Sequence, residues 1–419
     1  MNGQSRARRL RTITFLIVIA NALAGVGIRA QSPSTMNSAP AITAGSSVTI
    51  PFELVTRHIM VKVKVNNSRP LSFVLDTGDK VGVIDAEVAK QLGLTLQDQI
   101  RVGGAGAETL SASMVKDGNW TLPGLERFSQ PLTLALPLGR LAARFGHDFD
   151  GIIGSDFIRQ FVVEVDYQNR LLKIHDKDKF AYSGTGESIP IQLNGQGFPL
   201  FDAEVTPVGS DPIKGKFVLD LGSSGSLVLM SPVVSEHNLL GNGLKTIQAL
   251  GVGGAGGKST GQIGRVQSLQ IGKFKVPNTL TLFSEDQSGA MATRTLIGNI
   301  GQQIASKFKI ILDYSHQRII LEPNSTFAEP MDRVGSGMVL IADGQDHTTI
   351  RVTDVLEKSP ASDAGVQKDD IIVSVDGKAT SELNLTRLSE MFEQPQSRKL
   401  RIKRGEQALQ ITLTPRKLI

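Results

Sequence analysis

Apolar and polar residues alternate along much of this chain with the two-residue period of β-strands. Residues 59–65 (IMVKVKV) place apolar side chains at every second position, residues 66–68 (NNS) predict a turn, and residues 71–75 (LSFVL) return the chain. This pattern predicts a β-hairpin. Short apolar runs broken by Gly, Pro, Asn and Asp continue through most of the remaining sequence. We therefore expect a mainly β protein.

An internal repeat organises residues 48–323. FVLDTG at 73–78 returns as FVLDLG at 217–222, which places Asp76 and Asp220 exactly 144 residues apart. VGGAG at 102–106 returns at 252–256, and GIIG at 151–154 returns as TLIG at 295–298. Three landmarks in one order at nearly constant spacing predict two copies of one β-rich lobe.

Each lobe carries one acidic residue at the same place in the repeat. Asp76 and Asp220 both follow the apolar run FVL and precede a glycine two residues later. Burial of a lone carboxylate is costly, but two lobes related by a pseudo-twofold axis would bring the two carboxyl groups together. Such a pair shares one proton. It therefore contains both the base that activates a water molecule and the acid that protonates a leaving amine.

These motifs resemble those of pepsin and retropepsin-type aspartic proteases. FVLDTG is similar to the catalytic loop of that family, GGAGAETLSASMV at 103–115 to its glycine-rich flap, and GIIG to the segment beneath the loop. The resemblance implies a two-lobed acid-protease β-barrel pseudo-dimer, with Asp76 and Asp220 as the catalytic dyad. It also implies that the catalytic loops are shaped by Thr77, Gly78 and Gly222, and that the flap candidates are Gly103, Gly104, Gly106, Gly253, Gly254 and Gly256.

The sequence departs from the family pattern at two positions beside the dyad. Leu221 replaces the Thr or Ser whose hydroxyl would help to tie the two loops together, and Asp79 adds a third carboxyl group. A nearby carboxylate raises the pKa values of the dyad. Two functions follow: an aspartic endopeptidase, or a catalytically inactive two-lobed protein that binds peptides.

The C-terminal segment resembles a PDZ domain over residues 349–380. SPA at 359–361 opens a short helix, and VDGK at 375–378 forms a turn between strands, although Asp369 stands where that family usually has Gly. The resemblance implies a small α+β domain that binds the C-termini of peptides. Residues 385–392 are the expected groove helix, whose apolar side chains fit either the groove or the core. The expected carboxylate-binding loop consists of Gly335, Ser336, Gly337 and Met338.

Charge and hydropathy identify a leader at the start of the chain. The chain has 45 Lys and Arg and 40 Asp and Glu, which gives a net charge of +5. Residues 1–30 account for this excess, because they contain five arginines and no acidic residue. That segment continues with the apolar run TITFLIVIA and ends in small residues, as a secretory signal peptide does. An uncleaved signal anchor is the alternative. Either form predicts export, to the periplasm or the outside of the cell.

The remaining composition excludes several other classes of function. Without its leader the chain has no net charge, so we expect no nucleic-acid partner. GVGGAGGKST at 251–260 resembles a phosphate-binding loop, but no strand and helix alternate around it, and we expect no nucleotide. The six histidines are scattered, and we expect neither metal nor cofactor.

The expected organisation therefore has five parts. They are a signal peptide (1–30), a flexible linker (31–47), protease lobe 1 (48–183), protease lobe 2 (184–323) and a PDZ domain (328–419). The expected partners are polypeptide substrates in the cleft and C-terminal peptides at the PDZ domain. Because both lobes lie in one chain, we expect a monomer, with an obligate dimer as the alternative.

Overall fold

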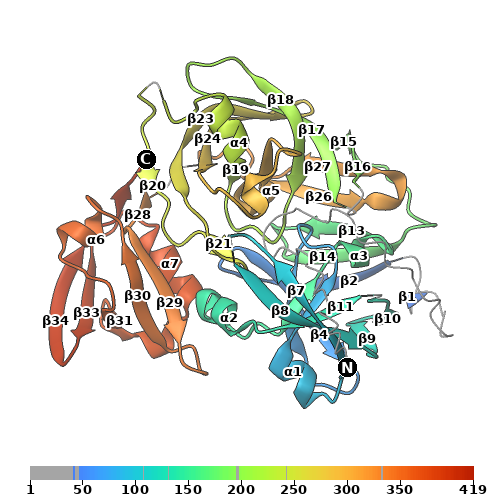
Figure 1. Cartoon of the computed structure of the whole chain (residues 1–419), viewed down its shortest axis with the longest axis horizontal. Helices are drawn as coiled ribbons and strands as arrows, with labels where there is room; N and C mark the ends of the chain where they lie inside the picture. The colour runs from blue at the N-terminus through green and yellow to red at the C-terminus, as the bar shows by residue number, and fades with distance from the viewer. Residues whose placement is uncertain are drawn as a thin grey trace, which may run out of the picture.

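The computed structural model describes residues 41–42, 47–106, 108–130, 132–194, 198–241, 243–331 and 334–419. The predicted signal peptide and most of the predicted linker lie outside these residues. Two β-rich lobes lie against each other, and a smaller C-terminal domain lies beside both (Figure 1). No described helix is long and apolar enough to cross a membrane.

Lobe 1 is built on a long mixed sheet. The predicted hairpin is confirmed, with Val61 opposite Phe73 in an antiparallel pair. Residues 41–42, inside the segment expected to be a linker, form an edge strand of this sheet. In spatial order the strands are β1 (Ala41–Ile42), β10 (Leu125–Phe128), β9 (Trp120–Leu122), β4 (His58–Val65), β5 (Leu71–Leu75), β12 (Gly151–Ile153), β6 (Gly82–Asp85), β11 (Thr133–Leu136), β8 (Thr109–Lys116) and β7 (Thr95–Gly103), with β3 (Glu53–Val55) paired to β4.

Lobe 2 repeats the central part of that sheet. In lobe 1 the parallel pair β5 and β12 aligns Leu75 with Ile153, and in lobe 2 the equivalent pair aligns Leu219 with Ile300. The internal repeat is therefore also a structural repeat. In spatial order the strands are β16 (Gln192–Leu193), β17 (Pro199–Thr206), β18 (Ile213–Leu219), β25 (Gly298–Ile300), β19 (Leu227–Leu229), β24 (Phe274–Ser284), β23 (Gly261–Ile271) and β20 (Ile247–Gln248).

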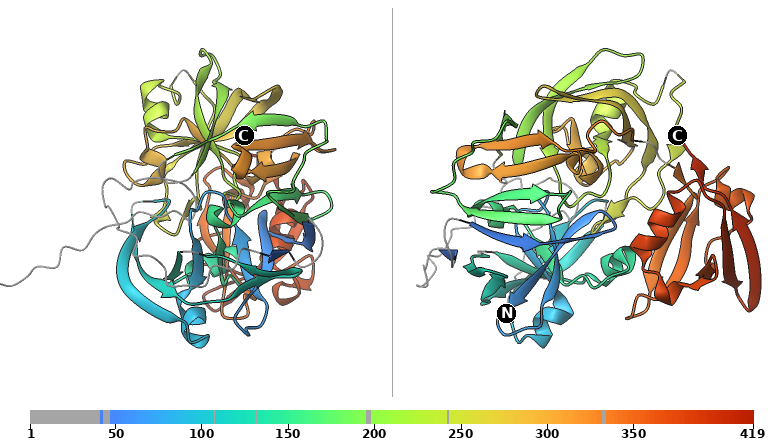
Figure 2. Two further views of the ribbon diagram at one scale, coloured as in Figure 1. Left: turned by 90° about the vertical axis from the view of Figure 1, so that its right-hand side faces the viewer. Right: turned by 180° about the vertical axis from the view of Figure 1, so that it is seen from behind.

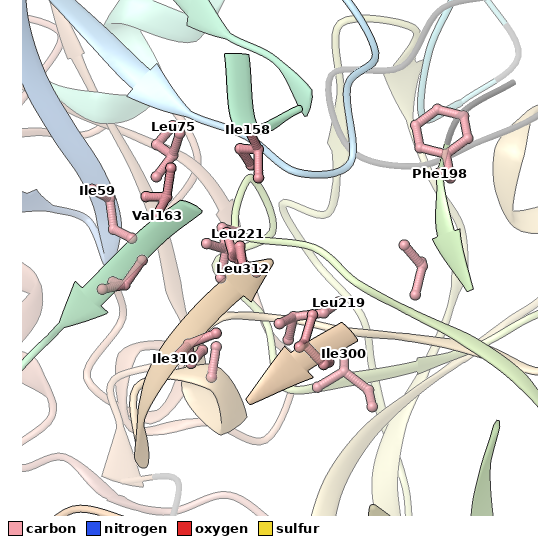
Figure 3. Packing of buried hydrophobic residues seen from close by; sticks show 14 of the residues in the cluster. Ile59, Leu75, Ile158, Val163, Phe198, Leu219, Leu221, Ile300, Ile310 and Leu312 are labelled. Atoms are coloured by element: carbon pink, nitrogen blue, oxygen red, sulfur yellow. The ribbon is translucent and has the colours of Figure 1, made fainter. Parts of the chain in front are cut away.

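A third sheet joins the two lobes. Its two halves meet where Val163 of lobe 1 lies opposite Leu312 of lobe 2 in an antiparallel pair. Apolar side chains from both lobes, among them Leu75 and Leu221, pack into one continuous core near this junction (Figure 3). In spatial order the strands are β15 (Glu187–Pro190), β27 (Arg318–Pro323), β26 (Phe308–Asp313), β13 (Phe161–Asp166), β14 (Leu171–Asp176) and β2 (Ser47–Pro51).

Short helices close the ends of the two lobes. The first of them begins where the Asp85 carboxylate accepts hydrogen bonds from the backbone of Glu87 and Val88, an N-cap that satisfies otherwise unpaired donors. The helices are α1 (Ala86–Gln91), α2 (Gly139–Phe145), α3 (Ser155–Ile158), α4 (Ser231–Glu236) and α5 (Gln302–Ala305), with the 3-10 turns η1 (Ala290–Ala292) and η2 (Tyr314–His316).

The C-terminal domain has its own sheet and core, and it lies against both lobes (Figure 2). Leu388, Met391 and Phe392 on its long helix are buried in that core, so packing accounts for their helical spacing. The elements are the sheet β29 (Met338–Asp343), β30 (Thr349–Val355), β31 (Ile371–Val375), β33 (Arg398–Arg404) and β34 (Gln407–Leu413), with β32 (Lys378–Ala379) on β31, the pair β28 (Val334–Gly335) and β35 (Arg416–Lys417), α6 (Pro360–Asp363), α7 (Leu385–Phe392) and η3 (Thr380–Glu382).

Candidate active site

The two repeated carboxyl groups lie at equivalent places in the two lobes. Asp76 follows β5, and its backbone N–H donates to the carbonyl of Ile153 over 2.9 Å. Asp220 follows β18, and its backbone N–H donates to the carbonyl of Ile300, also over 2.9 Å. Both aspartates are fully buried. Each strand pair therefore delivers one carboxyl group to the junction between the lobes.

The two catalytic-loop candidates interlock at this junction. The backbone N–H groups of Gly78 and Gly222 each donate to the aspartate of their own loop, over 2.8 and 2.9 Å. A Cβ at Gly78 would lie 2.6 Å from Asp220 Oδ1, and a Cβ at Gly222 would lie 2.1 Å from the Asp76 carboxyl carbon. Only glycine fits at either position. The structure thus brings together four of the residues that the resemblance assigns to the catalytic loops.

Asp76 and Asp220 influence each other electrostatically, but their surroundings differ. Burial raises the pKa of both carboxyl groups, and the neighbouring Asp220 raises the pKa of Asp76 further. Asn299 Nδ2 donates to Asp220 Oδ2 over 2.7 Å, which opposes the rise at Asp220. No described residue donates to Asp76 Oδ2. These contacts favour ionisation of Asp220 over ionisation of Asp76.

Asn299 was not predicted from the sequence as a site residue. It follows Gly298, the glycine that matches Gly154 of lobe 1, and Ser155 stands at the corresponding place there. A comparison of the residues that follow these two matching glycines would have shown Asn in one lobe and Ser in the other. The repeat is therefore asymmetric at a position that supports the Asp220 carboxylate.

The Thr77 hydroxyl of lobe 1 connects the two catalytic-loop candidates, and Leu221 of lobe 2 has no hydroxyl to make the matching contact. Its hydroxyl donates to the carbonyl of Leu219 over 2.6 Å and accepts from the backbone N–H of Leu221 over 2.9 Å. Leu221 is fully buried in the core that the two lobes share. Its carbonyl instead accepts from Gln302 Nε2 over 2.6 Å, and Gln302 is held in turn by the hydroxyl of Tyr167. Gln302 and Tyr167 therefore contact the loop of lobe 2 at Leu221, the residue that has no side-chain hydroxyl.

Asp79 is a third buried carboxyl group near the dyad. Its side chain is 1% exposed, and neither oxygen has a side-chain partner among the described residues. Burial raises the pKa of Asp79 well above its usual range, and Asp79 raises the pKa of Asp76 in turn. The direction predicted from the sequence is confirmed. Asp79 therefore ionises less readily than an exposed aspartate.

The glycine-rich segments of the two lobes meet at their tips. Glu108 N donates to the carbonyl of Gly256 over 2.8 Å, and a Cβ at Gly104 would lie 2.7 Å from Gly256 N. The first tip belongs to the long hairpin of β7 and β8, and the second to the short pair β21 (Gly253–Gly254) and β22 (Gly257–Lys258). Figure 1 shows β21 beside the end of this hairpin. The flap role of these glycines stays a prediction.

A cavity of about 720 Å³ lies beside the loop that follows Asp220 and is lined in part by the second glycine-rich segment. Its lining includes Gly222 and Ser223, which follow Asp220, and residues 250–254. His58, which the sequence did not single out, also lines it and stacks edge-on against Phe145. Burial lowers the pKa of His58 to about 4, so this histidine is neutral at pH 7. In the sequence, His58 is a single histidine in an alternating strand pattern. Nothing in that pattern indicates that its side chain lines a cavity.

The predicted carboxylate-binding loop lies between β28 and β29 at one end of a second cavity, of about 210 Å³. Gly337 has a φ of 85°, and a Cβ there would lie 2.2 Å from the Cβ of Ser359. Ser336 accepts from Ala361 through its carbonyl and from the Met338 backbone through its hydroxyl. These contacts shape the loop, and its binding role stays a prediction.

Two family models match separate parts of the chain. Residues 61–157, which include Asp76 and the first glycine-rich hairpin, match the aspartyl protease model. Residues 351–404 match the PDZ domain model. The chain combines an aspartyl protease domain with a PDZ domain. It is mainly β, with two β-rich lobes that share the internal repeat, followed by a small α+β domain.

Solved structures with similar parts include an aspartic proteinase from Irpex lacteus, at 12% identity and a TM-score of 0.41, over 68% of this chain and 99% of that one. The PDZ domain of HtrA3 with a phage-derived ligand matches 20% of this chain and 86% of its own length, at 23% identity and a TM-score of 0.19. The photosystem II D1 C-terminal processing protease has 25% identity and a TM-score of 0.19, over 20% of this chain and 24% of its own length. No curated protein matches the chain.

Proposed function

We propose that this protein is an aspartic endopeptidase that cleaves peptide bonds with the pair Asp76 and Asp220. One observation carries the proposal: the two repeated carboxyl groups are buried at the junction of the lobes, and a donor, Asn299, reaches the second oxygen of Asp220 while no described residue donates to Asp76 Oδ2. That difference assigns the base to Asp220 and the acid to Asp76. The aspartyl protease domain supports a protease-like function in general.

The proposed reaction needs only these two groups and water. Ionised Asp220 removes a proton from a water molecule, which attacks the carbonyl carbon of the scissile bond. Protonated Asp76 donates a hydrogen bond to the carbonyl oxygen as negative charge develops there. When the tetrahedral intermediate collapses, the leaving nitrogen takes a proton from the pair and the C–N bond breaks. The pair then again holds one proton.

The glycine-rich tips have a separate proposed role. The second tip borders the cavity, and we propose that the two tips together cover an extended peptide and exclude bulk water from the reacting bond. Their backbones approach closely because Gly104 and Gly256 carry no side chain. A substrate must therefore part the tips in order to enter.

Cleavage of unfolded casein by the mature chain tests the proposed activity. The assay covers acidic to neutral pH and includes a peptide whose hydroxyl group mimics the tetrahedral intermediate. We expect cleavage that this peptide inhibits, with a metal chelator as the control without effect. Absence of cleavage at every pH contradicts the proposal.

A second candidate function is peptide binding without catalysis. Two observations favour it: the buried Leu221, which supplies no hydroxyl to the loops, and the third buried carboxyl group, that of Asp79, near the dyad. Tight binding of the hydroxyl-containing peptide together with intact casein at every pH would support this candidate over the endopeptidase.

We also propose that the protein is exported. Support comes from the arginine-rich, apolar leader and from the absence of net charge in the remaining chain. N-terminal sequencing after expression in bacteria tests this. A mature terminus after Ala24 or Ala30 in the exported fraction agrees with a cleaved signal, and an intact terminus in the membrane fraction agrees with an anchor.

The oligomeric state proposed is a monomer, because one chain supplies both carboxyl groups and both glycine-rich tips. Sedimentation of the mature chain distinguishes this from the alternative. A single species near the mass of one chain agrees with the proposal, and an obligate dimer contradicts it.

A further inference from the structure

Residues 416–419 connect the PDZ domain to lobe 2, and we call them the strap. The first part of the strap belongs to the PDZ domain, where β35 pairs with β28 and Arg416 lies opposite Gly335. Arg416 also pairs with Asp363 of α6 over 2.8 Å. The last residue of the strap, Ile419, leaves the PDZ domain and packs against lobe 2. Figure 1 shows this end of the chain beside β20 and β28.

Ile419 occupies an apolar site on lobe 2. Its side chain is 8% exposed and clusters with Ala249, which follows β20, with Ile263 of β23 and with Leu280 of β24. Val252, in the second glycine-rich segment, packs against the same cluster. Burial of an isoleucine side chain is strongly favourable. The strap is therefore fastened to lobe 2 mainly by this one residue.

One arginine of lobe 2 holds both ends of the PDZ domain. Arg265 Nη2 donates to the backbone oxygen of Ile419 over 3.3 Å and to the carbonyl of Met331 over 2.9 Å. Its Nη1 donates to the carbonyl of Asn278 on β24 over 2.8 Å. Met331 lies before the first strand of the PDZ domain, and Ile419 lies after its last strand. The guanidinium thus fixes both ends of that domain to the hairpin of β23 and β24.

The site of Ile419 lies at the base of the second glycine-rich segment, residues 251–258. Ala249 lies two residues before this segment, and its backbone N–H donates to the carbonyl of Gly261 on the other side over 3.0 Å. Ala249 and Val252 both pack in the cluster that contains Ile419. The strap therefore shares one apolar cluster with the part of the chain that leads to the second tip.

The PDZ domain also contacts the flank of this segment. A Cβ at Gly251 would lie 2.7 Å from Cγ1 and 3.6 Å from Cβ of Val339 on β29. Lys258 Nζ pairs with Asp354 Oδ2 over 3.7 Å, but the lysine side chain is 86% exposed, so this ion pair contributes little. Close packing at Gly251 is therefore the main contact of the flank with the PDZ domain.

Lobe 1 holds the same segment from its other end. Glu108 of lobe 1 donates to the carbonyl of Gly256 at the tip, and Arg144 of α2 donates to the carbonyls of Gly251 and Gly253. In order to part from lobe 1, the segment must either separate from β29 or carry the PDZ domain with it. Packing at Gly251 opposes the first movement, and the strap opposes the second.

We propose that the strap holds the cleft closed: burial of Ile419 on lobe 2 fixes the PDZ domain against the second glycine-rich segment, and release of Ile419 lets the two move together away from lobe 1. This inference rests on the proposed endopeptidase function, in which a substrate must part the tips. Ile419 is a positioning residue, because it acts through the glycine-rich segment and not on the reacting bond.

The variant Ile419→Asp tests the strap on the full mature chain. Burial of an unpaired carboxylate is costly, so the side chain should leave its apolar site. We expect hydrogen exchange at residues 251–258 to rise about tenfold or more, the factor that burial of one isoleucine supports. Both tips keep their own residues and can still close over a peptide. Because the open population rises, kcat/KM should increase about threefold or more through a lower KM.

Val373→Asp is the matched control. Val373 lies on β31 of the same domain and is 39% exposed, so this variant should change neither exchange nor kcat/KM. The fold of both variants is verified by circular dichroism. Equal effects in the two variants overturn the inference, as does a lower kcat/KM in folded Ile419→Asp.

A reversible cross-link tests the same movement and leaves Ile419 in place. The chain has no cysteine, and the 3.6 Å between the two Cβ positions at 251 and 339 suits a disulfide. In the double variant Gly251→Cys, Val339→Cys, oxidation prevents separation from β29 and should lower kcat/KM about tenfold or more. A reductant should restore it, and addition of Ile419→Asp should restore it without a reductant. Equal activity of the oxidised and reduced double variant overturns the inference.

Failure of the proposed chemistry is distinguishable from failure of the strap, because hydrogen exchange does not require cleavage. If the parent chain cleaves no peptide, the endopeptidase function fails and exchange alone judges the strap. Faster exchange at residues 251–258 in Ile419→Asp, without a change in Val373→Asp, supports the strap. Unchanged exchange in Ile419→Asp overturns it.

Discussion

Asn299 Nδ2 donates a hydrogen bond of 2.7 Å to Asp220 Oδ2. The matching position in lobe 1 holds Ser155, whose hydroxyl has no partner among the described residues. Two lobes that share a repeated motif therefore give their carboxyl groups different environments. In the proposed mechanism, this difference assigns the base to Asp220 and the proton to Asp76.

The first prediction concerns Asn299→Ala. Loss of the donor disfavours the ionised form of Asp220 and raises its pKa, so the acidic limb of the pH profile should move to higher pH. At a pH below the optimum, kcat/KM should fall about tenfold or more. The matched control is Ser155→Ala in the other lobe, which should leave the profile in place. A profile that does not move in Asn299→Ala contradicts the assignment of the base.

A second prediction concerns stability and Asp79→Asn. Burial raises the pKa of Asp79 in the folded state, so its contribution to stability is fully present below the unfolded pKa and is lost as the pH rises through the folded pKa. The side-chain amide in the Asp79→Asn variant does not ionise, so the variant does not lose this stability as the pH rises. The variant should therefore be more stable at pH 7, with a gain of ~1 kcal/mol raising Tm by ~2–4 °C.

Thermal unfolding of the Asp79→Asn variant at several pH values checks this. The difference in Tm between variant and parent should shrink towards pH 3, where the unfolded carboxyl group is also protonated. A difference that is the same at pH 3 and pH 7 would show that ionisation of Asp79 is not its cause.

The third prediction concerns the hydroxyl of Thr77. Thr77→Val keeps the shape but removes the donor to Leu219 and leaves the backbone N–H of Leu221 buried without a partner. We expect the free energy of unfolding to fall by about 1–3 kcal/mol. Denaturation in urea measures it, with Thr121→Val at a partly exposed strand position as the control. An equal loss in both variants would argue against a special role for the Thr77 hydroxyl.

A fourth prediction tests the meeting of the glycine-rich tips. The Cβ of Gly256→Ala would lie 2.7 Å from the carbonyl oxygen of Ala105. Since backbone must move to make room, we expect hydrogen exchange to rise at both tips and kcat/KM to fall about tenfold. Gly139→Ala meets no atom within 4 Å and should change neither quantity. Unchanged exchange at the lobe 1 tip in Gly256→Ala would contradict contact between the tips in solution.

Repetition made much of this site predictable from the sequence. The pair Asp76 and Asp220 stood out because both sit in one motif that occurs twice, and the repeat required the two motifs to occupy equivalent places in space. The hairpin over 58–75 followed from strict alternation of apolar residues. Residues marked by the spacing of the repeat, or by the alternation of apolar and polar residues in a strand, could therefore be predicted from the sequence alone.

The sequence did not predict residues whose roles depend on contacts between elements that are far apart in the chain. His58 and Arg144 lie more than 70 residues before the cavity segments at 222 and 251, and neither belongs to a motif. The replacement of a hydroxyl at Leu221 by the Gln302 amide also required coordinates, because Gln302 lies 81 residues away. The position of the PDZ domain against lobe 2 depends on side-chain contacts between domains, for which a single sequence carries no signal.

The most direct test of the central claim is the cleavage of casein by Asp76→Asn and Asp220→Asn, each compared with the parent chain. Circular dichroism verifies that both variants are folded, and binding of the hydroxyl-containing peptide verifies that the cleft is intact. If the two carboxyl groups act as one pair, each substitution alone should abolish cleavage. Full activity in either variant would contradict the shared dyad.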